Sequence, residues 1–261
     1  MAISNPPNSS KRVALFVTCL VDVFRPSVGM ATVQLLEDAG CEVVVPPGQT
    51  CCGQPGYNSG DRAAATAIAR RVIEMLEPYQ HVVVPSGSCG GMIRKHYPEL
   101  FAGDADWAPR AKAVAGKTYE LTAFLTHVLG RKTVSARFPA HATFHDSCSA
   151  LRELGLRSEP RQLLSSVEGL TISELSDRDA CCGFGGTFAV KYPDISNAIV
   201  EKKTADVAAT GAELLISGDL GCLLNIAGKL KREGSRVQVR HVAEVLAGMV
   251  DLPAIGEGSR S

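Results

Sequence analysis

The sequence predicts an α/β protein composed of two similar lobes, each with a short parallel β-sheet. Helical patterns alternate along the chain with short segments rich in Val, Ile and Leu, which is typical of parallel sheets covered by helices. A length of 261 residues suits one large domain or two small ones. A pattern of four cysteines occurs twice, and this repeat indicates two lobes related by a pseudo-twofold axis.

The first half of the chain is expected to alternate strands and helices after a disordered tail at residues 1–10. The segment VALFVT has the composition of a buried strand and leads into Cys19, while Gly40 and Pro78 are suited to end the helices before them. The expected elements are a strand at 13–18, a helix at 26–39, a strand at 41–46, a helix at 63–76, a strand at 81–84, a helix start within 85–91 and a helix at 121–129.

The second half repeats this order of elements. The expected elements are a strand at 142–144, a helix at 159–166, a strand at 170–172, a helix at 193–210, a strand at 213–216, a helix ending near Lys231, a strand at 237–239 and a helix at 242–249. We therefore expect a first lobe at residues 11–139, a second lobe at 140–251 and a C-terminal tail at 252–261.

Eight of the nine cysteines fall into two matched quartets. In each quartet a single cysteine is followed by an adjacent pair with a glycine, and then by a last cysteine. The step from the single cysteine to the pair is 32 positions in the first quartet and 33 in the second, and the step from the pair to the last cysteine is 37 and 40. The first quartet is Cys19, Cys51, Cys52 and Cys89, and the second is Cys148, Cys181, Cys182 and Cys222.

The position and spacing of the quartets predict two metal or redox centres. Every quartet cysteine ends a predicted strand or lies in the loop after it, which is where open α/β sheets bind ligands. Adjacent cysteines suit an iron–sulfur cluster, because neighbouring thiolates can bind different irons, whereas they are a poor chelate for one zinc ion. Gly53 and Gly183 offer positive φ beside a bulky cluster, and the glycines around them offer bare N–H groups to anions.

Two alternatives to a cluster are a zinc site and a redox-active dithiol. A disulfide within Cys51–Cys52 or Cys181–Cys182 would be strained, and it would leave the other four quartet cysteines without a role. Cys41 belongs to neither quartet and is interpreted as a buried core thiol.

Composition excludes several classes of function. Lys plus Arg and Asp plus Glu both number 27, so the chain has no electrostatic signature of a nucleic-acid or anionic-membrane binder. We expect a cytoplasmic protein, since the N-terminal residues do not resemble a secretory signal and no apolar run is long enough to span a membrane. GxGxxG, GxxxxGK[ST], HExxH and GxSxG motifs are missing, so nothing indicates nucleotide, flavin or serine-hydrolase chemistry.

Several segments together resemble the CCG-domain, or cysteine-rich-domain, family of iron–sulfur proteins. The segments that carry the resemblance are FVTCLVDVFRP, CCGQPGYNSGD, VVVPSGSCGGMIRKHYP, FHDSC, CCGFGGTFAVKYPDIS and SGDLGCLLNI. The family includes the CCG-containing component of heterodisulfide reductase and the iron–sulfur subunits of glycolate oxidase and of anaerobic glycerol-3-phosphate dehydrogenase. The chain is most similar to the stand-alone two-repeat members that take part in lactate utilization, and the resemblance spans about residues 13–246.

The resemblance implies an electron-transfer component of a multi-subunit system that oxidises L-lactate to pyruvate. It implies one or two 4Fe–4S clusters on the two quartets, with zinc as the alternative metal. It also implies two partners, a second iron–sulfur protein with ferredoxin-like sites and a third component of the same system. A heterodisulfide-reductase-like thiol/disulfide enzyme and a zinc-binding structural subunit are the alternative functions.

The sequence departs from the family pattern at two positions. In heterodisulfide reductase each repeat ends in CxxC and so has five cysteines, but here the first position of that pair is Ser86 or Asp219. The departure favours a four-thiolate centre, or an oxygen ligand from one of these two residues. The chain also has no ferredoxin-type CxxCxxC module, which is why a partner is expected to relay electrons.

A few polar residues near the quartets are further candidates. His145 and Asp146 closely precede Cys148 and are expected to support the second centre or to be satisfied by the backbone. Arg94, Lys95 and His96 are expected to face an acidic partner or substrate, or to be ordinary solvated surface. Lys191 is expected to place a cation near the second centre or a substrate carboxylate, or to be a solvated lysine at the start of a helix. Asp22 and Arg25, near Cys19, are likewise either functional or ordinary solvated surface.

Overall fold

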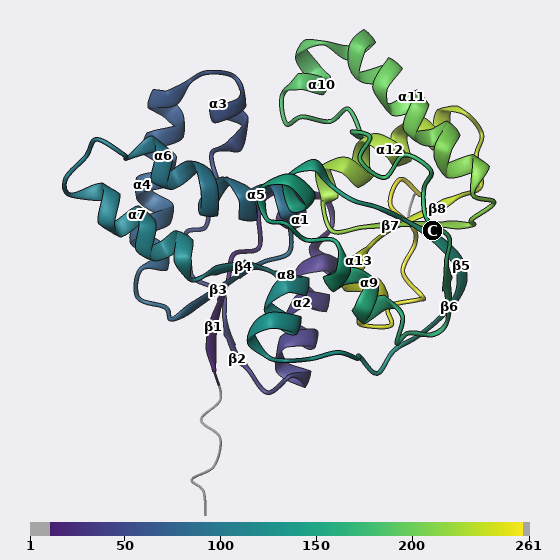
Figure 1. The fold of residues 1–261 in the computed structure, drawn as a ribbon, viewed down its shortest axis with the longest axis horizontal. Helices are drawn as coiled ribbons and strands as arrows, with labels where there is room; N and C mark the ends of the chain where they lie inside the picture. The colour runs from purple at the N-terminus through teal and green to yellow at the C-terminus, as the bar shows by residue number, and fades with distance from the viewer. Residues whose placement is uncertain (1–10, 258–261) are drawn as a thin grey trace, which may run out of the picture.

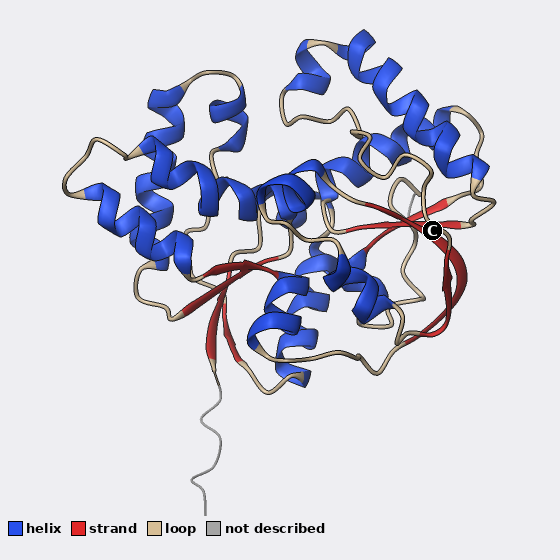
Figure 2. Cartoon of the chain, viewed as in Figure 1, coloured by secondary structure: helices blue, strands red, loops and turns tan. Residues whose placement is uncertain are grey.

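The computed structural model describes residues 11–257 and contains two four-stranded sheets, both entirely parallel. The strand orders are β2-β1-β3-β4 and β6-β5-β7-β8, so the second sheet repeats the topology of the first (Figure 1, Figure 2). This confirms the predicted fold class. The predicted tail at 1–10 and the last four residues of the predicted tail at 252–261 lie outside the described residues.

The predicted strands and helices of the first lobe occur in the predicted order, together with a fourth strand and several helices that the sequence does not predict. The strands are β1 (Arg12–Leu15), β2 (Glu42–Val44), β3 (His81–Val84) and β4 (Thr118–Glu120). The α-helices are α1 (Cys19–Phe24), α2 (Pro26–Asp38), α3 (Gln54–Asn58), α4 (Arg62–Leu76), α5 (Gly87–Gly91), α6 (Tyr97–Leu100), α7 (Trp107–Gly116) and α8 (Leu121–Ala123), and the π-helical turns are η1 (Met92–His96) and η2 (Phe124–Val128).

The second sheet begins near residue 137. Its strands are β5 (Arg137–His145), β6 (Glu168–Ile172), β7 (Leu214–Ser217) and β8 (Gln238–His241). Its helical elements are η3 (Ser149–Glu153), α9 (Ser158–Leu164), α10 (Phe188–Lys191), α11 (Pro193–Ala209), α12 (Leu220–Arg232) and α13 (Val242–Leu246). The predicted boundary between residues 139 and 140 falls inside β5 and remains a prediction.

Most predicted elements are present, and the differences have physical reasons. Strand β5 starts before the predicted 142–144, with a register irregularity between Arg137 and Ala140 where Pro139 lies. A proline cannot donate to the ladder, so it masks the first part of this strand in the sequence pattern. The sequence pattern does not predict strand β4, because its residues Thr118–Glu120 (TYE) contain no run of branched apolar side chains. This short strand lies at the edge of the sheet and pairs only with β3.

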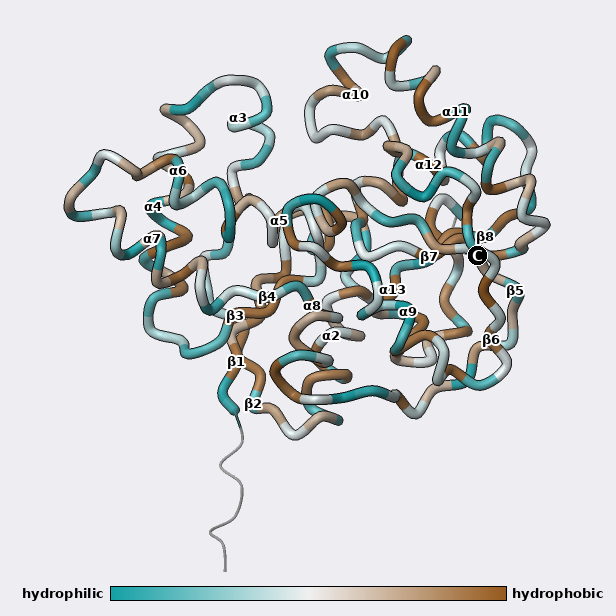
Figure 3. The backbone as a smooth tube through the Cα atoms, viewed as in Figure 1, coloured by the Kyte–Doolittle hydropathy of each residue, from teal (hydrophilic) through white to brown (hydrophobic). Residues whose placement is uncertain are grey.

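The two lobes share a hydrophobic core. One face of the first sheet packs on helices of its own lobe through Ala14, Val82 and Val84, which belong to one apolar cluster. The other face contributes Val13 and Val83 to a cluster that continues through the second sheet. The strands β1 and β3 are accordingly among the most apolar parts of the chain (Figure 3).

The contacts between the lobes are reciprocal. Helix α13 of the second lobe packs on α2 of the first, and α8 of the first lobe packs on α9 of the second; these helices lie between the two sheets (Figure 1). Helices α5 and α12 likewise contact η3 and α1 of the opposite lobe. Within residues 11–257, no helix combines the length and apolar character required to cross a bilayer.

Candidate metal centres

Both quartets lie at the carboxyl ends of their sheets, where the sequence predicts them. The single cysteines follow β1 and β5, the pairs lie in the loops after β2 and β6, and the last cysteines lie in α5 and α12 after β3 and β7. Parallel strands end at one edge of a sheet, so these loops meet there. All nine cysteines are free thiols.

The four thiols of the first quartet form a continuous chain of contacts. The Cys19 and Cys52 thiols both donate to Cys51 Sγ, and the Sγ atoms of Cys52 and Cys89 are 3.3 Å apart. Hydrogen bonds from the Cys19 and Cys52 thiols lower the pKa of Cys51 to about 2, while donation to Cys51 and burial raise the pKa of Cys19. Cys19 and Cys51 are half-buried, and Cys52 and Cys89 are buried.

The second quartet repeats this arrangement. The Cys148 and Cys182 thiols both donate to Cys181 Sγ, and Cys182 also contacts Cys222. Hydrogen bonds from Cys148 and Cys182 lower the pKa of Cys181 to about 2, and the bond to Cys181 together with burial raises the pKa of Cys148. The order of burial is also the same, with the first two thiols half-buried and the last two buried.

The glycine after each pair has the conformation that the sequence predicts. Gly53 has φ +86° and Gly183 has φ +81°, which are left-handed values that other residues adopt only with strain. The backbone N–H of Gly53 donates to Cys51 Sγ at 3.4 Å, and that of Gly183 donates to Cys181 Sγ at 3.3 Å. Each turn therefore directs an N–H group at the thiol whose pKa is lowered.

The carbonyl of the second cysteine in each pair has a partner that sequence reasoning missed. Tyr97 Oη donates to the Cys52 carbonyl at 2.9 Å, and Asn225 Nδ2 donates to the Cys182 carbonyl at 2.8 Å. Asn225 could have been found, because it lies three positions after Cys222 and so shares its helix face with it. Tyr97 gives no such signal, since it comes from a different element, α6.

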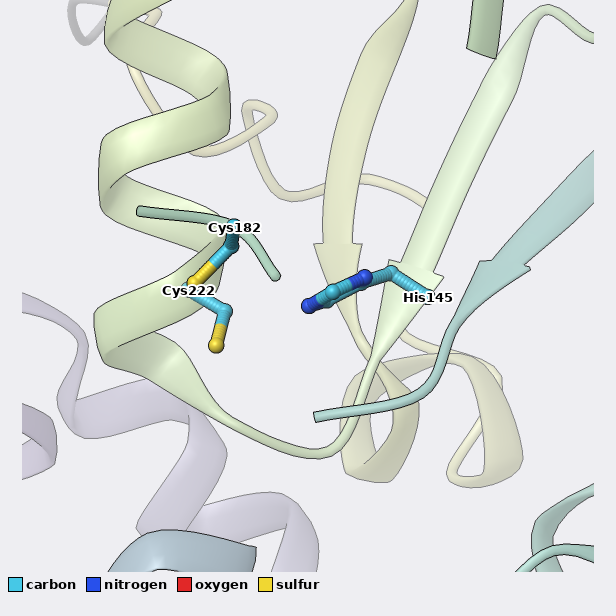
Figure 4. Close-up of side chains that lie close together, drawn as sticks. All are labelled: His145, Cys182 and Cys222. Atoms are coloured by element: carbon cyan, nitrogen blue, oxygen red, sulfur yellow. The ribbon is translucent and has the colours of Figure 1, made fainter. Parts of the chain in front are cut away.

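His145 lies at the end of β5 and faces the second quartet. Its side chain is fully buried, and neither ring nitrogen has a hydrogen-bond partner among the described residues. A ring nitrogen and the Sγ atoms of Cys182 and Cys222 all lie within 4.8 Å of one another (Figure 4). Burial, with the nearby charge of Lys203, lowers the pKa of His145 to about 3, so the imidazole is neutral at physiological pH.

Asp146, the other candidate before Cys148, is turned to a different partner. Its carboxylate accepts two hydrogen bonds from Arg161, at 2.9 Å and 2.7 Å, and Arg161 also binds Glu174. Asp146 therefore supports the loop through an ion pair, whereas His145 faces the thiols.

Ser86 and Asp219, the positions that depart from the family pattern, meet each other across the lobes. Asp219 Oδ2 accepts from Ser86 Oγ at 3.3 Å and from the Ser88 backbone N–H at 2.8 Å, and both side chains are buried. Ser86 Oγ also accepts from the Cys89 N–H at 3.4 Å and so begins α5. An oxygen ligand from either residue remains a prediction.

A cavity of about 220 Å³ lies beside the first quartet. Its lining combines thiols of the first lobe with residues of the second lobe, most of which are apolar. The residues that define it include Cys19, Cys51, Cys89, Phe184, Val190 and Leu220.

The remaining candidates have ordinary structural surroundings. Asp22, Lys95 and Lys191 are exposed, and Cys41 is buried in the core as predicted. The other three basic residues bond to protein groups: Arg94 donates to the Thr118 carbonyl, His96 contacts Glu99, and Arg25 pairs with Glu244.

The residues of both sites fit a thiophilic metal centre. Each site brings four thiols into one chain of contacts, and the second adds a buried imidazole whose nitrogens have no partner among residues 11–257. Four thiolates are the usual ligand set of an iron–sulfur cluster, and mixed sulfur and nitrogen donors also suit zinc.

Comparison with known proteins agrees with this arrangement. The cysteine-rich domain of the CCG family matches residues 13–94 and 142–227. The chain is 49% identical over 236 residues to lactate utilization protein A 2 of Bacillus cereus (strain AH820), across 90% of this chain and 98% of that protein. It is 53% identical over 235 residues to lactate utilization protein A of Bacillus subtilis (strain 168), with the same coverage.

A solved structure shares the fold at much lower sequence identity. The crystal structure of a hypothetical protein from Helicobacter pylori superposes with a TM-score of 0.65 at 12% identity, over 98% of this chain and 50% of that one.

Proposed function

This chain belongs to the cysteine-rich-domain (CCG) family, and from that premise we propose that it is the iron–sulfur electron-transfer component of a system that oxidises L-lactate to pyruvate. The observation that carries the proposal is the chain of four thiols found twice, at equivalent edges of two equivalent sheets. The quartets Cys19, Cys51, Cys52, Cys89 and Cys148, Cys181, Cys182, Cys222 are the proposed ligands.

An iron–sulfur cluster, when bound, accepts and passes on single electrons. Oxidation of lactate to pyruvate releases two electrons and two protons, so two one-electron centres suit a relay for this reaction. The relatives' names support the lactate assignment, because both describe lactate utilization. We propose a cytoplasmic location and two partners: a ferredoxin-like iron–sulfur protein and a third component of the system.

The protein contributes ligand placement and protection to each proposed centre. The Gly53 and Gly183 N–H groups donate to a thiol sulfur, and such bonds stabilise negative charge on the sulfur and raise a cluster's potential. Two thiols of each quartet are buried, and the other two are half-buried, so that a partner could exchange electrons with the centre through them.

Metal analysis of protein purified without oxygen tests the proposal. We expect iron and acid-labile sulfide at about four to eight each per chain, with an EPR signal that changes on reduction or oxidation. Stoichiometric zinc without sulfide would overturn the electron-transfer function and make both quartets structural sites. A Cys181→Ser variant that kept full lactate oxidation in the reconstituted system would also contradict it.

The cavity beside the first quartet favours a second candidate, a thiol/disulfide redox enzyme of the heterodisulfide-reductase kind. The cavity is about 220 Å³ and includes the half-buried Cys19 and Cys51, so a small disulfide could approach that centre. Oxidation of the reduced protein by a small disulfide, followed by EPR, would support this function. If small disulfides do not oxidise the reduced protein, the second candidate is contradicted and electron transfer is the only proposed function that remains.

A further inference from the structure

His145 combines complete burial with two unsatisfied nitrogens. Its side chain is 0% exposed, and within residues 11–257 no group hydrogen-bonds to either Nδ1 or Nε2. Buried polar groups in proteins nearly always have a partner, because leaving them unpaired costs free energy. The imidazole therefore requires a partner other than the protein groups described.

Packing alone does not require a histidine at this position. His145 lies three residues before Cys148, and the equivalent residue three before Cys19 is Phe16. Phe16 is also fully buried, and it directly follows strand β1. The same fold thus accommodates a purely apolar ring at this position in the first lobe.

The direction of the ring indicates what the partner is. The imidazole points from the end of β5 toward Cys182, in the loop after β6, and Cys222, in α12 (Figure 4). The donor atoms of these three residues lie within 4.8 Å of one another. Donors on one tetrahedral metal atom, with metal–sulfur bonds of about 2.3 Å and metal–nitrogen bonds of about 2.0 Å, lie only somewhat closer together than this.

We propose that His145 is a ligand of the metal centre in the second lobe, binding through a ring nitrogen beside Cys182 and Cys222. The inference rests on the proposed function only in that a metal centre occupies the second quartet. The second centre then has a nitrogen ligand, which the first centre lacks because Phe16 lies at the matching position.

Replacing thiolate with neutral imidazole raises the reduction potential of an iron–sulfur centre. If His145 takes the place of one quartet thiolate, it would make the second centre the better electron acceptor of the two. The two lobes would then have distinct positions in the relay.

Isotope labelling tests the ligation without any substitution. Protein made with ¹⁵N-histidine and purified without oxygen is compared with unlabelled protein by pulsed EPR of the paramagnetic centre. We expect a nitrogen coupling whose frequency changes with the label, and its loss in His145→Phe. His141→Phe is the matched control, because His141 lies in the same strand but bonds to Ser173 Oγ at 2.8 Å.

The outcomes separate this inference from the proposed function. Iron and sulfide at the expected amounts, with no histidine coupling in any centre, would overturn the role of His145 and leave electron transfer standing. Absence of iron and sulfide would overturn the electron-transfer function, and zinc binding would then decide the role of His145.

Zinc titration of the metal-free full-length protein provides that second measurement. We expect His145→Phe to weaken Zn²⁺ binding at the second quartet at least tenfold, and His141→Phe to leave it unchanged. Equal affinity in wild type and His145→Phe would contradict the inference. The metal-free His145→Phe protein is expected to unfold at the same urea concentration as wild type or a higher one, because the substitution removes unpaired buried nitrogens; this separates lost ligation from misfolding.

Discussion

The two lobes hold their thiols in the same way but surround them differently. Two positions next to the quartets are apolar in the first lobe and polar in the second. They lie three residues before the single cysteine and three residues after the last cysteine. The corresponding residues are Phe16 and His145, and Met92 and Asn225.

This difference shows which part of a duplicated site is fixed by the fold and which part can diverge. Strand ends, the glycine turns and the helices α5 and α12 place the thiols identically. The neighbouring residues do not set that placement, so they are free to set polarity and hydrogen bonding, which tune a metal centre's potential. Two similar scaffolds can thus hold two centres of different potential.

The lobes also differ in how closely the quartet helices approach the opposite lobe. Helix α5 packs so tightly on η3 that a Cβ at Gly87 would lie 2.7 Å from Ala150 Cβ. At the equivalent contact between α1 and α12, a cavity lies beside Cys19 and Leu220. The first quartet therefore has a cavity beside it that can admit a small molecule.

Removing a single cysteine from one quartet or the other should have the largest effect, a loss of bound iron. Comparing the two single variants tests whether the centres form independently. We expect Cys51→Ser and Cys181→Ser each to lose about half of the iron bound by wild type, because each disrupts one four-thiolate set. Cys41→Ser, which changes a thiol outside both quartets, should keep all of it. Iron analysis of anaerobic protein is the measurement, and complete loss from either quartet variant would show that the centres depend on each other.

A buried ion pair joins the lobes, and breaking it should give the next largest effect. Arg25 Nε lies 2.7 Å from Glu244 Oε1, and the Glu244 side chain is fully buried. We expect Arg25→Ala to lower the free energy of unfolding by roughly 3 kcal/mol, since the carboxylate stays buried without its partner. Arg157→Ala, which breaks an exposed pair with Asp179, should cost less than about 1 kcal/mol. Urea denaturation of both variants provides the comparison, and equal losses would mean that burial adds nothing to the pair between the lobes.

The same pair gives stability a defined pH dependence. Burial alone would raise the pKa of Glu244, but hydrogen bonds from Arg25 and Ser27 outweigh it and lower the pKa below the ordinary 4.5. The stabilisation is therefore present above about pH 4.5 and is lost as the pH falls through the folded-state pKa. The stability difference between wild type and Glu244→Gln should be constant near neutral pH and shrink in acid. A difference that persisted unchanged at pH 3 would argue against a charged pair.

Sequence patterns predict the scaffold and the thiols because both depend on local signals. Alternating apolar strands and helix ends indicate both sheets, and spacing alone indicates that each quartet gathers at a sheet edge. The surroundings of the thiols depend on contacts between distant segments. Tyr97 reaches Cys52 from another helix, and Asp219 bonds to Ser88 of the opposite lobe, so no local pattern indicates either contact.

The glycines after the cysteine pairs should tolerate alanine to different degrees. A Cβ at Gly183 would lie 2.8 Å from the Ser196 carbonyl oxygen, whereas at Gly53 the nearest atom, the Ala65 carbonyl oxygen, would be 3.4 Å away. Both have positive φ, so we expect Gly53→Ala to cost about 1 kcal/mol for backbone strain and Gly183→Ala about 2 kcal/mol because a clash is added. Thermal unfolding of the metal-free proteins is the measurement. A larger loss for Gly53→Ala would show that the two turns are less alike than their φ values indicate.

The smallest predicted effect concerns the hydrogen bonds to the pair carbonyls. Burial raises the pKa of Tyr97 well above its ordinary value, so Tyr97 is a neutral donor to the Cys52 carbonyl at any working pH. We expect Tyr97→Phe to lower the free energy of unfolding by about 1 kcal/mol, which is the net value of one such bond. Asn225→Leu removes the hydrogen bond to the Cys182 carbonyl and should lower the free energy of unfolding by the same amount.

The two substitutions should nevertheless differ in a second measurement, the reduction potential of the centre beside each carbonyl. Tyr97→Phe keeps an aromatic ring in a site that is already apolar, so the potential of the first centre should barely change. Asn225→Leu removes a polar group from the more polar second site, and losing this dipole beside the thiolates should move the potential of the second centre. Redox titration followed by EPR compares the two shifts. Equal shifts in both lobes would mean that the thiols and the glycine N–H groups set both potentials, and that the polar residues of the second lobe do not.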